Sequence, residues 1–88
     1  MSRLTYFYQD SQHFLIYVDK ATSSIHAKYI HAKHNTQELF SSYTARDLCN
    51  KILLKHQSKI NNFHSAYLGR ELLRAEISLI LGQDYVQS

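Results

Sequence analysis

The stretch from Asn62 to Gly82 constrains the fold most, because it is the longest uninterrupted helical pattern in the chain. Asn62 favours the start of a helix and Gly82 favours its end, so both ends carry a chemical stop signal. A helix of about 20 residues is roughly 30 Å long at 1.5 Å per residue, which is about the diameter of a small domain. The other elements therefore have to pack along this one.

The apolar residues of this helix form a broad arc when they are placed at 100° per residue. The arc has two flanks, namely Leu68, Leu72, Ala75 and Leu79 on one side and Ala66, Leu73, Ile77 and Ile80 on the other. So broad an arc predicts contact with two neighbours, such as a sheet and a second helix. Gly69 lies inside the arc, and a glycine within a helix costs about 1 kcal/mol relative to alanine. We therefore expect another backbone to approach closely at Gly69.

The opposite side of the helix is polar and consists of Arg70, Glu71, Arg74 and Ser78. This pattern is typical of a solvated face with a Glu–Arg pair three residues apart. Arg70 and Arg74 are also suited to clamping an anion, such as a phosphate or a pterin-linked glutamate. The sequence leaves both interpretations open.

Glu76 is unexpected, because it falls within the apolar arc. A carboxylate there has a raised pKa unless it is paired, and such a group can act as a proton donor or a base. Glu76 could group with Arg70, Arg74 and His64. We favour a structural interpretation, either an ion pair or a side chain that reaches past the helix edge to solvent. His64 is expected to be packed and neutral at pH 7, because the helix dipole disfavours an imidazolium near the N-terminus.

The sequence before the long helix predicts strands. A continuous apolar run at residues 14–18 predicts a strand that is buried on both faces, or nearly so. Alternation over residues 25–30 predicts a half-buried strand, joined to the first by a roughly six-residue connection. Residues 39 and 40 predict a short edge strand, and residues 4–8 are β-prone as well.

A second helix is predicted after these strands. Residues 44–47, Thr-Ala-Arg-Asp, resemble a capping box in which aspartate stands in for glutamate. Apolar residues at helical spacing follow, and the pattern ends near His56. The order of elements predicts an α+β domain over residues 1–88, with a small antiparallel sheet of about three strands and two C-terminal helices on one face.

Composition narrows the classes of function. The formal charge of +3 is too small to argue for nucleic-acid binding by itself. The single cysteine, Cys49, cannot form an internal disulfide, which suits a reducing compartment. The apolar runs are far shorter than the roughly 18 residues of a membrane span. The chain is therefore expected to be a small domain that does not cross a membrane.

The sequence gives little support for a metal site, a phosphate-binding loop or a nucleic-acid-binding surface. The spacing of His26, His31 and His34 matches no established metal-ligand pattern, so we predict no metal and no cofactor. With Gly69 and Gly82 as its only glycines, the chain cannot form a glycine-rich phosphate loop. Tyrosines near lysines are found in single-strand nucleic-acid binders, but no ribonucleoprotein-type motif accompanies them here. Nucleic acid is therefore the weakest of the partner classes.

The C-terminal third resembles a known small domain of unknown function. The resemblance rests on His64, residues 66–72 (AYLGREL), Ala75-Glu76, Leu79, Gly82 and Tyr85-Val86-Gln87, and residues 14–19 resemble the opening strand of that domain. The domain stands alone in cyanobacteria and in red-algal-type plastids, as a hypothetical chloroplast protein. It is also fused to archaeal proteins related to dihydropteroate synthase or thymidylate synthase. Ser65 and Ser88 depart from its pattern, where alanine and aspartate are usual.

This resemblance implies a location in the chloroplast stroma or in cyanobacterial cytoplasm, and it brings no established activity. The candidate residues for ligand or partner contact are His64, Tyr67, Arg70, Glu71, Arg74 and Glu76. None is assigned a catalytic role, and the absence of a complete catalytic constellation argues against an enzyme without excluding one. We expect a non-catalytic interaction or assembly module that binds itself or a larger protein. The alternatives are a ligand-binding or accessory domain in one-carbon or pterin metabolism, and a weak nucleic-acid binder.

Overall fold

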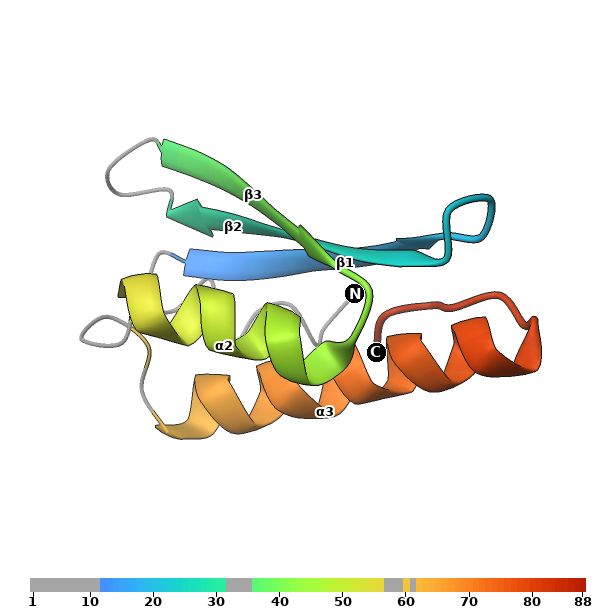
Figure 1. Ribbon diagram of the computed structural model, residues 1–88. Coiled ribbons are helices and arrows are strands. Elements are labelled where there is room, and N and C mark those ends of the chain that lie inside the picture. Colours follow the sequence, from blue (N-terminus) through green and yellow to red (C-terminus); the bar gives the residue numbers. More distant parts are fainter. Residues whose placement is uncertain (1–11, 32–35, 57–59, 61) are drawn as a thin grey trace.

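The computed structural model describes residues 12–31, 36–56, 60 and 62–88, which form a sheet covered on one face by two helices (Figure 1). The strands are β1 (Gln12–Asp19), β2 (Ser24–His31) and β3 (Thr36–Ser42). The helices are α2 (Ala45–His56) and α3 (Asn62–Leu81). The predicted α+β class and the arrangement of its layers are confirmed. The β-prone residues 4–8 lie outside the described part of the chain.

The three strands form an antiparallel sheet in the order β1-β2-β3, so β1 and β3 are its edges. Asp19 pairs with Ser24, which leaves residues 20–23 as the connection, shorter than predicted. Ser23 takes a positive φ of 56° within it. Strand β3 is longer than predicted, because its pairing with β2 continues from Thr36 to Ser42.

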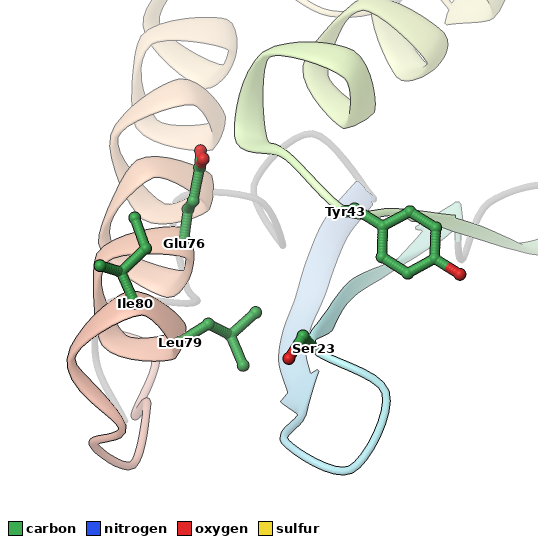
Figure 2. Close-up of a pocket in the computed structure, with 5 residues that line it drawn as sticks. All are labelled: Ser23, Tyr43, Glu76, Leu79 and Ile80. Atoms are coloured by element: carbon green, nitrogen blue, oxygen red, sulfur yellow. The ribbon is translucent and has the colours of Figure 1, made fainter.

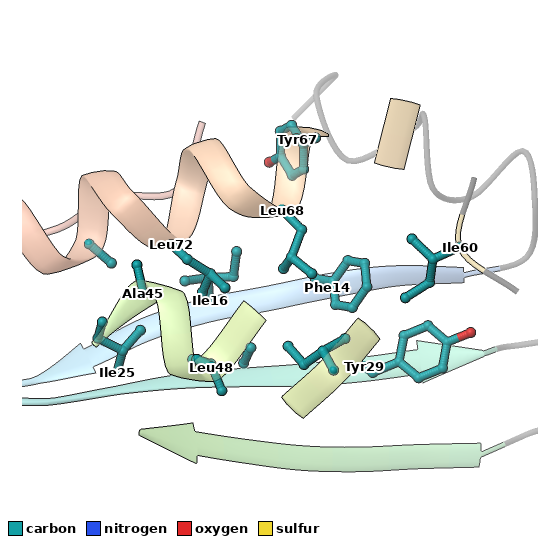
Figure 3. Packing of buried hydrophobic residues seen from close by; sticks show 13 residues of the cluster. Phe14, Ile16, Ile25, Tyr29, Ala45, Leu48, Ile60, Tyr67, Leu68 and Leu72 are labelled. Carbon is teal, nitrogen blue, oxygen red and sulfur yellow. The ribbon is translucent and has the colours of Figure 1, made fainter. Parts of the chain in front are cut away.

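The core lies between the sheet and the two helices (Figure 3). Phe14 and Ile16 of β1 point into it and are buried, whereas Leu15 and Tyr17 between them are 36% and 45% exposed. The prediction that this strand is buried on both faces was wrong. Successive side chains of a strand alternate between faces, and in the described structure the helices cover one face only.

Hydrogen bonds confirm the predicted start of α2 and the predicted end of α3. The Thr44 hydroxyl accepts a hydrogen bond from the Asp47 N–H at 3.2 Å, so α2 has the predicted N-cap. Helix α3 ends in a Schellman motif, in which the Gly82 N–H donates to the Leu79 carbonyl and the Gln83 N–H donates to the Ser78 carbonyl. Gly82 has a φ of 69°, which glycine adopts without strain. This motif turns the chain, and the tail after Gly82 runs back beside α3 (Figure 1).

Helix α3 buries one side only. Leu68, Leu72 and Ala75 are fully buried on the side that contacts the sheet and α2. The second predicted flank is exposed; it consists of Ala66, Leu73, Ile77 and Ile80. The broad buried arc was therefore a wrong prediction, because both neighbours of α3 lie toward the same side. Neither described helix is long and apolar enough to cross a membrane.

Candidate functional site

Glu71, which the sequence places on a solvated face, is fully buried. The tail after α3 covers it. Its Oε1 accepts hydrogen bonds from Arg74 Nη1 at 2.5 Å, from the Tyr85 hydroxyl at 2.7 Å and from the Ser88 N–H at 3.2 Å. Its Oε2 lies 3.2 Å from Arg70 Nη2. The predicted Glu–Arg pair is present, but in a buried cluster rather than on an open surface.

The surroundings of Glu71 keep it ionised. Burial alone would raise the pKa of this carboxyl, but the hydrogen bonds from Tyr85 and Ser88 and the charge of Arg74 outweigh burial and lower the pKa. Burial and the bond to Glu71 raise the pKa of Tyr85, so its hydroxyl stays protonated and continues to donate. A carboxylate with several donors and a lowered pKa is a poor proton donor or base. The geometry therefore makes Glu71 an anchor for the tail.

Gln87 attaches the end of the tail to the edge of the sheet. Its Oε1 accepts the Ile16 N–H at 2.9 Å, and its Nε2 donates to the Phe14 carbonyl at 2.9 Å. The side-chain amide thus stands where the peptide group of a further strand would pair with β1. Nε2 also lies 3.2 Å from the Tyr67 hydroxyl, which donates to the Ser88 carbonyl at 2.5 Å. The tail is therefore bound both to β1 and to α3.

Four of the six predicted contact residues come together in this cluster, namely Tyr67, Arg70, Glu71 and Arg74. The Arg70 guanidinium lies 5.2 Å from the centre of the Tyr67 ring, and that of Arg74 lies 5.5 Å from the Tyr85 ring. Tyr85, Gln87 and Ser88 complete the cluster, although the sequence analysis did not select them. The sequence did contain a signal for them, because an aromatic residue and an amide residue follow the glycine that ends the helix.

Glu76 and His64 do not join this cluster, so the grouping of Glu76 with Arg70, Arg74 and His64, which the sequence analysis considered and did not favour, is not formed. Glu76 Oε1 accepts the Ala45 N–H at 2.9 Å and so helps to cap the start of α2. Figure 2 shows its carboxylate pointing toward that helix. His64 is 2% exposed, with its ring centre 5.7 Å from that of Phe63. Packing of His64 agrees with the sequence prediction.

The side of α3 that faces away from the sheet carries an outer stripe, which we define as Ala66, Gly69, Leu73, Ile77 and Ile80. Leu73, Ile77 and Ile80 are 53%, 46% and 74% exposed. Apart from the nearby backbone of α3 itself, no atom of the described residues lies within 4 Å of the position that a Cβ at Gly69 would occupy, so the predicted close approach is absent from the described structure. Gly69 and Leu73 instead line a shallow groove of about 330 Å³ beside Cys49 of α2.

Two pockets lie near the turn between β1 and β2. The smaller one, about 180 Å³, is lined by Ser23, Tyr43, Glu76, Leu79 and Ile80 (Figure 2). The larger one, about 540 Å³, is lined by residues that carry polar or charged groups, namely Thr22, Ser24, His26, Ser41, Ser42, Tyr43, Asp47 and Lys51. His26 Nε2 lies 2.9 Å from the Ser24 hydroxyl, and its Nδ1 lies 2.7 Å from the Ser41 hydroxyl. The larger pocket therefore presents hydroxyl groups, an imidazole, a carboxylate and an ammonium group.

The described residues contain no group of three or more histidine, cysteine or acidic side chains that could hold a metal ion. His26 and His31 belong to β2, and His34 lies outside the described residues. Burial raises the pKa of the Cys49 thiol, which disfavours a thiolate nucleophile at that position.

The comparisons with known proteins agree with the resemblance drawn from the sequence. The family model of PterinBD-DUF4346 matches residues 9–88. The Ycf91-like protein of Nostoc sp. strain PCC 7120 is 34% identical over 100 aligned positions, which cover 85% of this chain and 79% of that protein. The uncharacterized protein ycf91 of Porphyra purpurea is 40% identical over 50 positions, covering 54% of this chain and 41% of that protein. No solved structure matches. These relatives confirm the predicted setting, a plastid or a cyanobacterial cytoplasm.

Proposed function

We propose that this chain, which belongs to the PterinBD-DUF4346 family, is a non-catalytic module that binds another protein through the outer stripe of α3. The exposure of Leu73, Ile77 and Ile80 on one side of a helix whose other side is buried carries the proposal. A contiguous apolar surface on a folded domain is typical of a protein-binding site, whereas single exposed apolar residues are ordinary.

The polar residues of α3 support the proposal, because they already contact another part of the same chain. Tyr67, Glu71 and Arg74 are occupied by the tail of the same chain. Their contacts stabilise the fold, so they are poorly placed to take a ligand while the tail is bound. The outer stripe has no such covering among the described residues. The apolar surface of the outer stripe is chemically suited to binding a protein partner.

A substitution at the centre of the stripe tests the proposal. A tagged chain expressed in cyanobacterial cells should migrate in native extract as a complex larger than 10.3 kDa. Leu73→Glu should release it as a monomer, because burying an unpaired carboxylate in an apolar interface is unfavourable. The matched control is Leu15→Glu, at an exposed position on the sheet face away from the helices, which should leave the complex intact. An unchanged complex in Leu73→Glu would refute the proposal.

A second candidate function is binding of a small heterocyclic ligand in the larger of the two pockets near the turn between β1 and β2. Two observations favour it. The pocket volume of about 540 Å³ falls in the range of roughly 300–1,000 Å³ that small-molecule sites occupy, and the name of the matching family refers to pterin binding. The family resemblance also places this domain beside dihydropteroate-synthase-related sequences in archaeal fusions.

Thermal unfolding in the presence of pterins and folates tests this candidate. A ligand of the native state raises its stability by about 2.7 kcal/mol at 100 times its dissociation constant. His26→Ala should remove that shift if the pocket is the site, whereas Leu54→Ala, at a position 82% exposed on α2, should keep it. Unchanged unfolding with every pterin and folate would reject the candidate.

A further inference from the structure

We infer that the larger pocket near the turn between β1 and β2 holds its ligand by an aminopyrimidinone edge, which pterins and guanine share. This edge presents an amino group, a ring N–H and a carbonyl oxygen side by side. Asp47 accepts from the two N–H groups, and Lys51 donates to the oxygen. The inference rests on the second candidate function and specifies the class of ring that the pocket takes.

One wall of the pocket is a chain of hydrogen bonds. The Thr22 hydroxyl lies 2.6 Å from that of Ser24. His26 joins the Ser24 hydroxyl to the Ser41 hydroxyl through its two ring nitrogens, at 2.9 Å and 2.7 Å. The Tyr17 ring is stacked on the His26 ring, with the ring centres 5.0 Å apart. Because these contacts occupy both ring nitrogens of His26, this wall shapes the pocket, and recognition of a ligand falls to other lining residues.

Asp47 and Lys51 are lining residues of opposite charge, and they lie about one turn apart on α2. Lys51 Nζ donates to the Ser41 carbonyl at 2.9 Å and lies 3.6 Å from Asp47 Oδ2. The Ser42 hydroxyl also donates to Asp47 Oδ2. The hydrogen bond from Ser42 and the charge of Lys51 lower the pKa of the Asp47 carboxyl, so it stays ionised. The end of β3 thus holds a carboxylate and an ammonium group side by side.

Both charged groups keep hydrogen-bonding capacity for a ligand. A carboxylate has about four acceptor positions and an ammonium group has about three donors, more than the contacts with Ser41 and Ser42 use. The side chains of Asp47 and Lys51 are 58% and 50% exposed, so a molecule in the pocket can reach them. An acceptor beside a donor matches a ligand edge that carries N–H groups beside a carbonyl oxygen.

The charges of the pocket favour an uncharged ligand. The opposite charges of Asp47 and Lys51 balance, and a phosphate drawn to Lys51 would be repelled by the neighbouring Asp47. An aminopyrimidinone ring is uncharged, and both of its contacts would be hydrogen bonds to a charged group, which are stronger than neutral ones. Tyr43 lines the pocket and is 70% exposed, so its aromatic face is accessible to such a ring. Figure 2 shows the Tyr43 ring extending away from α3.

Fluorescence titration of the full chain with pterin and with its diamino analogue tests the edge. In the analogue the ring N–H becomes an acceptor and an amino group replaces the oxygen, so the analogue opposes both Asp47 and Lys51. At pH 7, where both rings are uncharged, pterin should bind about tenfold more tightly. Lys51→Met should narrow this preference, because methionine keeps an apolar stem and removes the donor. Asp47→Asn should weaken the binding of pterin, because an amide accepts fewer hydrogen bonds than a carboxylate.

The matched control for Lys51→Met is Lys55→Met. Lys55 also belongs to α2, but it pairs with Glu38 and does not line the pocket. This control should keep the preference for pterin. Circular dichroism and unfolding without ligand show whether each variant is folded, and Lys51→Met tests the edge even if Asp47→Asn destabilises the start of α2. An unchanged preference in a folded Lys51→Met would overturn the role of Lys51.

A second pair of ligands distinguishes the two sources of the edge. Guanosine carries the same edge on a purine, and its diamino counterpart lacks the oxygen. Tighter binding of the carbonyl compound in either pair supports the inference, and the pair that shows it identifies the ligand as a pterin or a guanine. Equal binding within both pairs would overturn recognition by this edge, while the second candidate function would still stand. No binding of any of these rings would overturn both.

Discussion

The carboxylate of Glu71 and the hydroxyl of Tyr85 lie 2.7 Å apart, although the residues are 14 positions apart in the sequence and on different elements. Their hydrogen bond joins α3 to the tail that follows it. Because Glu71 is fully buried, the bond is shielded from water and is worth more than a similar one on the surface. The stability of the tail should therefore depend on this carboxylate.

Glu71→Gln should destabilise the protein by about 1–3 kcal/mol, since hydrogen bonds to a charged group are worth more than neutral ones. Glutamine keeps the shape of the side chain but loses its charge, so the bonds from Arg74 and Tyr85 weaken. Chemical denaturation gives the free energy of unfolding. The matched control is Arg70→Gln; its side chain is 59% exposed, and it should change stability by less than about 1 kcal/mol. Equal effects of the two changes would contradict the prediction.

The contribution of Glu71 should disappear at low pH. Its pKa in the folded protein is below the unfolded value of 4.5, so the unfolded state binds the proton more readily. The stabilisation is therefore fully present above about pH 5.5 and is lost as the pH falls through the folded pKa. The difference in free energy of unfolding between the wild type and Glu71→Gln, measured from pH 7 to pH 3, should shrink. A constant difference would show that ionisation is not its cause.

Gln87→Glu should loosen the edge of the sheet at β1. The carboxylate still accepts from the Ile16 N–H, but it cannot donate to the Phe14 carbonyl and would place negative charge beside it. We expect a loss of about 1–3 kcal/mol. Because the repulsion at Phe14 makes the tail leave β1 more often, hydrogen exchange at the Ile16 amide should be faster despite the remaining acceptor. Gln83→Glu is the control, because that side chain is exposed beyond the helix end. Unchanged exchange at Ile16 would mean that the tail does not protect this edge.

Leu72→Ala and Leu73→Ala should differ sharply although the residues are adjacent. Leu72 is fully buried, and its truncation should cost about 2–5 kcal/mol. The sequence placed Leu73 in the arc that was expected to be buried as well, but that residue is 53% exposed, and its truncation should cost less than about 1 kcal/mol. Both are measured on the purified protein at low concentration. Similar losses would indicate that Leu73 is buried in solution.

Gly69→Ala should stabilise the fold, contrary to what the sequence predicted. Among the described residues, no atom outside the nearby backbone of α3 lies within 4 Å of the added methyl position, so helix propensity acts alone and should add up to about 1 kcal/mol. The melting temperature at low concentration should rise. Gly82→Ala is the contrasting change, because the φ of 69° at that position is strained for alanine. A fall in melting temperature for Gly69→Ala would restore the close approach first expected.

The sequence alone was enough to predict the order of the described helices and strands and which of them are helices. The C-terminal end of α3 follows from local chemistry, because Gly82 supplies the positive φ that the Schellman motif needs. The N-cap at Thr44 likewise depends on residues within one turn of it. Alternation along β2 placed Ile25 and Tyr29 in the core, since side chains of a strand alternate between its faces.

The tertiary structure alone decided which carboxylate of α3 is buried. A helical projection shows the neighbours of Glu71 and Glu76 on the helix, but not what lies above each side chain. The tail reverses after Gly82 and covers Glu71, whereas the start of α2 supplies the donor for Glu76. The apolar flank of α3 was misassigned for the same reason. Periodicity shows which residues share a side of a helix, and burial depends on which elements pack against that side.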